Sequence, residues 1–204
     1  VRARFGELDG HLRWRAGDLP CMEWPRGGQA SLPGLVAALL THEGITLEHR
    51  PLPPLRIEAP LDAPVVLAAG WASEGLLDTP LGLGRMRGQV ARIRGATPPG
   101  LPILTGRGHA VALADGWSVG SSYRRLTGPA DAGDTVPTMA ERAENLERLA
   151  AWMRLRGIEA EREALNGAAV EDWAGVRATV PDRAPLVGRL APALWTSAGH
   201  ASSG

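Results

Sequence analysis

The sequence is poor in cysteine and has no long apolar stretch. Its 204 residues include a single cysteine, Cys21, so an internal disulfide is excluded and a reducing, cytoplasmic location is expected. No apolar run is long enough to span a bilayer, which argues against a helical membrane protein. Residues 2–7 are charged in part, which is not the pattern of a signal peptide. This length suits one medium domain or two small ones with a hydrophobic core.

Lysine is absent, so all 22 basic residues are arginines, and they balance 22 acidic residues to a net charge of zero. This balance excludes a global basic field of the kind that attracts nucleic acid. Any contact with nucleic acid would need a local arginine patch. Three close pairs are candidates either for such a patch or for solvated strand faces: Arg85 with Arg87, Arg92 with Arg94, and Arg124 with Arg125.

The common catalytic signatures are missing as well. The sequence contains no HExxH, CxxC or Walker motif, and no Gly-x-Gly-x-x-Gly opens the chain. The five histidines, at positions 11, 42, 49, 109 and 200, lack the spacing of metal ligands, so no metal is expected. Each histidine is interpreted as structural or solvated.

The first third of the sequence predicts an α/β arrangement. Residues 31–44 are expected to form a helix, with Pro33 in its first turn, an apolar stripe and Gly44 at its end. A strand at residues 45–48 follows. Residues 64–70 form a short apolar run closed by glycine, which is typical of a parallel strand covered on both faces.

The middle of the sequence predicts antiparallel strands. Residues 88–93 alternate between apolar and polar side chains, as in a strand with one wet face. Two further runs, 110–114 and 117–121, flank the pair Asp115-Gly116, which favours a tight hairpin because its backbone needs positive φ.

The later part of the sequence predicts one long helix over residues 138–157. Thr138 and Glu141 have the spacing of a capping box, and Gly157 would end the helix. Pro181 and Pro185 exclude a long helix between residues 176 and 187, and residues 194–198 are expected to form a final short strand. One face of the long helix would carry Met139, Leu146, Leu149 and Met153.

Three segments are candidates for function, each with a simpler structural interpretation. Gly70 ends the run 64–70, where backbone can approach a ligand, or it is a plain turn glycine. Arg177 lies in the proline-stiffened stretch 175–188, where it would bind a carboxylate bidentately or belong to a surface loop. Residues 199–204 form a Gly/Ser turn that offers backbone amides to an anion, or a flexible end.

Taken in order, these segments resemble the FAD-dependent amino-acid oxidase family, which includes glycine, sarcosine and D-amino-acid oxidases. Within that family the resemblance points to the oxidoreductase halves of bifunctional enzymes that modify the wobble uridine of tRNA and also carry a methyltransferase. The segments that carry the resemblance are 64–70, Arg87-Gly88-Gln89-Val90, Gly120-Ser121-Ser122-Tyr123, Glu144-Asn145, 176–188 and 199–204.

The resemblance implies an α/β fold with α+β elements. Residues 1–84 would be a partial FAD-binding, Rossmann-like layer, residues 85–185 an antiparallel substrate-binding part with the helix 138–157, and residues 186–204 a return to the FAD-binding part. The family's N-terminal glycine fingerprint, its last helix and the methyltransferase half have no counterpart in this sequence, so we expect an internal piece of such a protein.

The resemblance also assigns site residues. Arg177 would clamp a substrate carboxylate, with assistance from Tyr123. The cofactor would be FAD, held by residues at three places: Ala69 and Gly70; Gly188; and Gly199, His200, Ala201, Ser202, Ser203 and Gly204.

The reaction that follows from the resemblance is FAD-dependent oxidative removal of the carboxymethyl group from 5-carboxymethylaminomethyl-(2-thio)uridine at the tRNA wobble position, with release of glyoxylate. An N-substituted glycine suits a carboxylate-binding arginine, and FAD would do the redox chemistry. Two alternatives stay open. One is an oxidase of free glycine, sarcosine or another small amine, and the other is a non-enzymatic binding module.

Overall fold

The computed structural model describes residues 13–15, 21–23, 30–58, 60–95, 103–105, 108–156 and 168–200, and the structural statements below concern these residues. The chain divides into two compact units. The first holds residues 1–49 and 155–157, and the second holds residues 50–154 and 158–204. Among the described residues, no helix is both long and apolar enough to cross a membrane.

The first unit contains a two-stranded antiparallel ladder, β1 (Arg13–Arg15) with β2 (Cys21–Glu23), and helix α2 (Leu32–Leu40). Ser31 caps α2, because its side chain accepts a hydrogen bond from the Gly34 amide at 3.2 Å. The prediction that the helix runs to Gly44 is wrong. Thr41 turns its amide and hydroxyl back onto Ala38 and closes the helix there.

The strand predicted at residues 45–48 is not formed. The segment is exposed and in no ladder with a described strand. A β-branched run becomes a strand only where a neighbour pairs with its backbone, and none of the described strands does so here.

A three-stranded sheet in the second unit has the order β10 (Leu186–Ala191), β11 (Leu194–Ala198), β3 (Val65–Leu67). β3 runs parallel to β11, which confirms the predicted parallel strand and the predicted strand at 194–198. Leu67 and Leu194 share a core with Leu77, which follows the short helices η1 (Gly70–Ala72) and α3 (Ser73–Leu76). The expected cover on both faces is not present among the described residues, because Val66 is 64% exposed.

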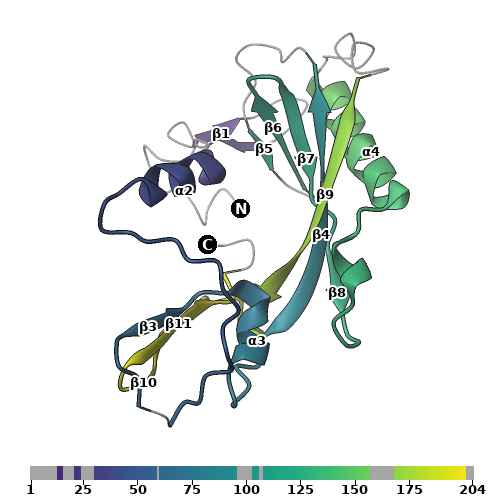
Figure 1. The fold of residues 1–204 in the computed structure, drawn as a ribbon. Helices are drawn as coiled ribbons and strands as arrows, with labels where there is room; N and C mark the ends of the chain where they lie inside the picture. The colour runs from purple at the N-terminus through teal and green to yellow at the C-terminus, as the bar shows by residue number, and fades with distance from the viewer. Residues whose placement is uncertain are drawn as a thin grey trace. The chain divides into compact units, whose positions relative to one another are not determined.

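The larger sheet is antiparallel throughout, and its strands are β5 (Leu104–Thr105), β6 (His109–Leu113), β7 (Gly116–Gly120), β4 (Gly84–Arg94) and β8 (Arg124–Leu126), in that order. β9 (Val170–Thr179) pairs with β4 over ten residues, from Gly84 opposite Thr179 to Ile93 opposite Val170. These two long strands run side by side toward the smaller sheet (Figure 1). The mixed α/β fold with an antiparallel sheet is therefore as predicted.

The predicted hairpin is confirmed, with its turn one residue earlier than the Asp-Gly pair suggests. Leu113 pairs directly with Gly116, so the two loop residues are Ala114 and Asp115. Gly116 takes the positive φ, at 147°, and a Cβ there would overlap the carbonyl oxygen of Ile93 on the adjacent β4. Glycine is required at this position by both backbone angle and space.

Helix α4 (Met139–Arg156) covers one face of the larger sheet (Figure 1). Leu149 and Met153 from the helix pack in one cluster with Ile93, Trp117 and Val119 from the strands. Leu146 packs at the edge of this cluster, as its spacing predicts. Met139 is 69% exposed, so its expected place on the apolar stripe is wrong, because the first turn extends past the edge of the core.

Replacement of Gly116 by alanine should destabilise the protein, because the new methyl group overlaps the Ile93 carbonyl and the backbone angle is strained. We expect a loss of at least about 1–3 kcal/mol in the free energy of unfolding. Urea unfolding measures it. Gly75→Ala is the matched control, since α3 leaves open space at Gly75, and it should be neutral or slightly stabilising. Equal stability of the two variants would contradict the steric explanation.

Candidate functional site

The side chains of β4 and β9 alternate between two faces of the larger sheet. Arg87, Gln89, Ala91 and Ile93 are buried on the face that carries α4. The alternate positions point to the opposite face, which we call the open face. Its members on these two strands include Met86, Gly88, Val90, Trp173, Gly175 and Arg177.

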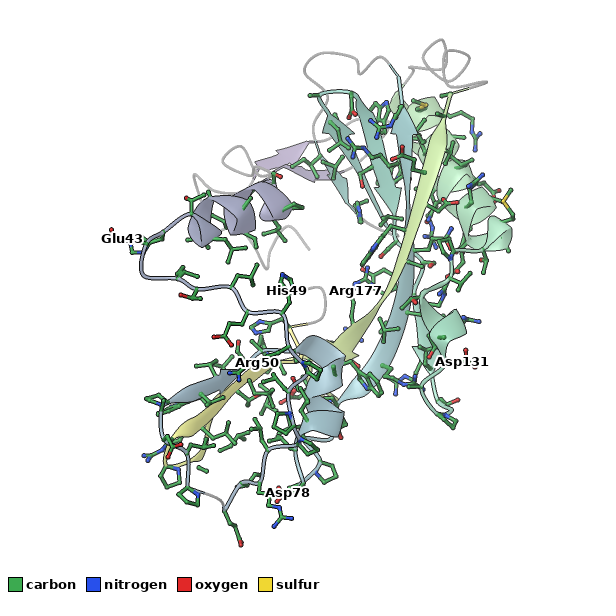
Figure 2. All side chains as sticks on the ribbon, in the orientation of Figure 1. Glu43, His49, Arg50, Asp78, Asp131 and Arg177 are labelled. Carbon is green, nitrogen blue, oxygen red and sulfur yellow. The ribbon has the colours of Figure 1, made fainter. Side chains whose placement is uncertain are left out.

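Arg177 is held on the open face by two residues that follow β7. Its Nη2 donates to the Ser121 hydroxyl at 2.8 Å, and its guanidinium carbon lies 5.0 Å from the centre of the Tyr123 ring. The guanidinium lies across Gly88, where a Cβ would come within 2.5 Å of Nη1. Figure 2 shows Arg177 on β9, on the side of the sheet away from α4. The structure thus brings together both residues that the resemblance assigned to the substrate.

The other terminal nitrogen of this guanidinium, Nη1, has no hydrogen-bond partner among the described residues. Arg177 Nη1 is buried and forms no hydrogen bond with any described residue. A buried, unpaired cationic donor is costly, and a bound anion would relieve that cost. The geometry therefore suits the oxygen of a carboxylate approaching the open face.

His109 belongs to the same face and was not singled out by its sequence position. It pairs with Gly120 across the β6–β7 ladder, and Gly120 in turn pairs with Val90. Burial lowers the pKa of His109, and the positive charge of Arg177 lowers it further. The imidazole is therefore neutral at pH 7. One indication of this position was present in the sequence: His109 comes just before the first strand of the predicted hairpin, so it lies opposite Gly120 at the end of the second strand.

Behind the sheet, Arg87 forms a buried ion pair that sequence analysis did not find. Its guanidinium is fully buried, and Nη2 lies 2.6 Å from a carboxylate oxygen of Glu141 in the first turn of α4. It also donates to the carbonyl oxygens of Asp134, in the short helix η2 (Ala132–Thr135), and Val136. Such a charge is tolerated in the interior because each of its donors is paired.

This ion pair connects to Arg177 through two neighbouring serines. Ser122 donates its hydroxyl to Glu141 at 2.6 Å and accepts a hydrogen bond from the Gln89 amide at 2.9 Å. Ser121, which binds Arg177, has its carbonyl oxygen held by Arg148 of α4 at 3.0 Å. The network behind the sheet therefore fixes the segment that holds the arginine in front of it.

The predicted capping box is half formed. The Thr138 hydroxyl accepts a hydrogen bond from the Glu141 amide at 3.3 Å, but the Thr138 amide donates to the side chain of Gln89 and not to Glu141. The carboxylate of Glu141 is instead used by Arg87 and Ser122. Burial would raise the pKa of Glu141, but hydrogen bonds from Arg87, Ser122 and Thr138 together outweigh it and lower the pKa to about 2.

A second group of predicted residues lies at one edge of the smaller sheet. Because β3 and β11 are parallel and Leu67 pairs with Thr196, both strands end at the same edge. Ala69 and Gly70 follow one strand, and Gly199 and His200 follow the other. Gly70 and Gly199 have φ values of 60° and 69°, a region that favours glycine. His200 Nε2 lies 2.9 Å from the Ser197 hydroxyl.

The other predicted cofactor residues are less informative. Gly188 lies exposed on β10, and a Cβ there would meet nothing within 4 Å among the described residues. Ala201, Ser202, Ser203 and Gly204 lie outside the described residues.

The ends of two strands that carry these groups pack together in a small core. Ala178, the neighbour of Arg177 in β9, packs in one cluster with Leu83 and with Ala198, the last residue of β11 before Gly199. The end of β9 therefore lies against the end of β11.

The three arginine pairs differ in their surroundings. Arg85 and Arg87 are buried and paired with Asp134 and Glu141, so their suggested role in a surface patch is wrong. Arg92 and Arg94 are exposed but bound to Asp115, and Arg94 also to Glu171. Arg124 and Arg125 on β8 are exposed, and none of the described carboxylates is within ion-pair distance of them.

Sequence comparison places this chain beside part of a longer protein. No protein-family model matches. The tRNA 5-methylaminomethyl-2-thiouridine biosynthesis bifunctional protein MnmC of a Polaromonas species is 31% identical over 242 aligned residues, covering 99% of this chain and 36% of that protein. The MnmC protein of Thiobacillus denitrificans is 33% identical over 150 residues, covering 72% and 24%. The chain thus spans about a third or less of these relatives.

Structure comparison gives the fold. Glycine oxidase from Geobacillus kaustophilus matches with a TM-score of 0.52 at 19% identity, over 68% of this chain and 36% of that chain. Iminodiacetate oxidase from a Chelativorans species matches with a TM-score of 0.52 at 20% identity, over 72% and 39%. The strands and α4 described above therefore have the arrangement found in amino-acid oxidases.

Stability at acid pH should depend on Glu141. Its pKa is about 2 when folded and near its ordinary 4.5 when unfolded, so its contribution is complete above about pH 5 and is lost as the pH falls toward 2. We expect Glu141→Gln to be less stable at pH 7 and to lose less stability on acidification, as measured by urea unfolding between pH 3 and 7. Glu147→Gln, at an exposed carboxylate on the same helix, is the control. The same acid dependence in wild type and Glu141→Gln would contradict the assignment.

Proposed function

We propose that this chain, which has the fold of amino-acid oxidases and is similar to part of the MnmC proteins, is the oxidoreductase part of such a tRNA-modifying protein. Its reaction is the oxidative removal of the carboxymethyl group from 5-carboxymethylaminomethyl-2-thiouridine at the wobble position of tRNA. The side group of this uridine is an N-substituted glycine, so the substrate presents a carboxylate next to the carbon–nitrogen bond that is oxidised.

The observation that carries this proposal is the unpaired Nη1 of Arg177. A carboxylate bound there would complete the hydrogen bonds of a guanidinium already oriented by Ser121 and Tyr123. A hydrogen bond between charged groups of this kind contributes about 1.5–3 kcal/mol. Arg177 therefore anchors the substrate, and Ser121 and Tyr123 hold the anchor in place.

His109 supports the same site in a different way. Being neutral at pH 7, it adds no positive charge beside Arg177, and a substrate amine is not repelled from this part of the open face. Its ring nitrogens remain able to accept or donate one hydrogen bond.

The edge of the smaller sheet is the proposed place for FAD. The coincident ends of β3 and β11, each followed by a glycine with positive φ, allow backbone to approach a ligand closely, as at the carboxyl edge of other α/β sheets. Ala69, Gly70, Gly199 and His200 would hold the cofactor there, with Gly188 and residues 201–204 as further proposed contacts. FAD, when bound, supplies the two-electron acceptor that the side chains of this protein lack.

The second candidate is an oxidase of free glycine, sarcosine or another small amine. The net charge of zero favours it, because nucleic-acid binding relies on basic surface. The exposed Arg125 favours the tRNA substrate instead. Arg125 lies opposite Met86, which itself lies opposite Arg177, so it is on the open face beside the proposed anchor. A binding module without activity is the third possibility, and turnover of either substrate would exclude it.

Replacement of Arg177 by alanine should lower kcat/KM about 10- to 100-fold, because one charged contact to the substrate carboxylate is lost. Flavin content, measured by absorbance, should not change. Arg177→Lys should recover part of the activity, since it keeps the charge but not the two-pronged geometry. Arg183→Ala, at the exposed turn after β9, is the control. Normal kcat/KM in Arg177→Ala would contradict the proposed anchor.

Replacement of Arg125 by glutamine should weaken tRNA binding and reduce its salt dependence. Each phosphate contact contributes roughly 0.7–0.9 to the slope of log affinity against log salt, so the slope should fall by about 0.8. Filter binding at several salt concentrations measures this, and turnover of the free nucleoside should not change. Arg92→Gln, already neutralised by Asp115, is the control. An unchanged slope in Arg125→Gln would argue for the small-amine substrate.

A further inference from the structure

Trp173 is a large aromatic side chain on the open face, and 65% of it is exposed. It lies on β9, four residues before Arg177, so the two side chains are on the same face of the strand. Exposed indoles of this size are uncommon without a binding role, because their burial elsewhere would be favourable.

The indole lies along the sheet and does not stand away from it. The Cη2 atom is 2.5 Å from where a Cβ of Gly175 would be, and Cζ2 and Cζ3 are 3.0 and 3.1 Å from that point. The end of the indole therefore covers Gly175, in the same way that the guanidinium of Arg177 covers Gly88.

Gly175 and Gly88 are directly paired between β9 and β4. Opposed residues in an antiparallel pair have Cα atoms about 4.5–5.5 Å apart. The Trp173 indole and the Arg177 guanidinium thus lie next to each other, over main-chain atoms of Gly175 and Gly88. A ligand that uses both must combine a planar ring and a carboxylate at a separation of this order.

Four other tryptophans in the described ranges already contact neighbouring side chains. Trp117 is buried in the core under α4 and Trp152 packs against it. Trp71 has the guanidinium of Arg85 at 4.9 Å from its ring centre, and Trp195 has that of Arg189 at 5.8 Å. Tyr123 is covered in the same way by Arg177. Trp173 has no such partner among the described residues, so its ring is available for stacking.

We propose that Trp173 is the stacking platform for the uracil ring and is the residue that selects a nucleobase with a carboxylate-bearing side group over a free amino acid. This inference rests on the proposed function. In that substrate, three atoms link the carboxyl carbon to the ring, a span of about 5 Å when extended. The carboxylate at Arg177 therefore places the ring at Trp173. Free glycine and sarcosine have no ring and use Arg177 alone.

The test uses the full, FAD-loaded protein and three variants, Trp173→Ala, Trp173→Leu and Trp173→Phe. The substrates are the nucleoside 5-carboxymethylaminomethyluridine and sarcosine. With the nucleoside we expect KM to rise about 10-fold or more in the alanine and leucine variants and to be largely restored by phenylalanine. With sarcosine all four proteins should have the same kcat/KM. Leucine is the matched control, because it keeps apolar contact with Gly175 but has no planar face.

A binding measurement separates this inference from the proposed reaction. 5-Carboxymethyluridine has the ring and the carboxylate but no oxidisable amine, and calorimetry should give an affinity about 10-fold weaker for Trp173→Ala than for wild type. Equal affinities, or an equal loss of nucleoside and sarcosine turnover in Trp173→Ala, would overturn the inference. Failure of the wild-type protein to oxidise the nucleoside would instead contradict the proposed function, whereas the calorimetric comparison would still decide the role of Trp173.

Discussion

The pairing of Arg87 with Glu141 is the interaction on which the rest of the second unit depends. It joins the central strand β4 to the first turn of α4 at a point where the guanidinium has no access to water. Either charge alone at this depth would be strongly unfavourable, and the pair is acceptable only because Ser122, Gln89 and nearby carbonyl oxygens complete its hydrogen bonds. The requirement to satisfy all of them at once fixes how the helix, the strand and the segment after β7 fit together.

The same hydrogen bonds also affect the open face of the sheet, because successive side chains point to opposite faces. Neighbouring residues in an extended segment face opposite ways, so Ser122 serves the buried pair and Ser121 serves Arg177. A cation on the open face is thus oriented by a carboxylate on the other side, without contact between them. The site is rigid for the same reason that the core is rigid.

Much of the fold was readable from local sequence signals. The hairpin, the long helix and the parallel strand β3 each had short-range patterns, and all three are present. The failures share a cause. The strand at 45–48 and the helix end at Gly44 were inferred from single segments, but strand formation depends on a neighbour and the helix end on the Thr41 side chain. Met139 has helical spacing but lies beyond the reach of the sheet.

Only part of the candidate site could be predicted from the sequence. Arg177, Tyr123 and the strand-end glycines came from the family resemblance, and the structure brings the first two into contact. Their roles toward substrate and cofactor remain predictions. The surroundings of Arg87, Glu141, His109 and Trp173 were not predicted, because they arise from contacts between segments that are far apart in sequence, such as β4 with β9. The pattern of residues within one segment cannot predict that Gly88 and Gly175 pair between two strands.

The adjacency of Gly88 and Gly175 also bears on how the proposed site could change. Neither residue has a side chain, so the surface beneath the Arg177 guanidinium and the Trp173 indole is formed by main-chain atoms. A methyl group at position 88 would displace the guanidinium, so glycine is required there for the present position of Arg177. On the proposed function, a different side chain at position 173 would change which ring the site accepts, while the contact between Arg177 and the carboxylate would stay the same.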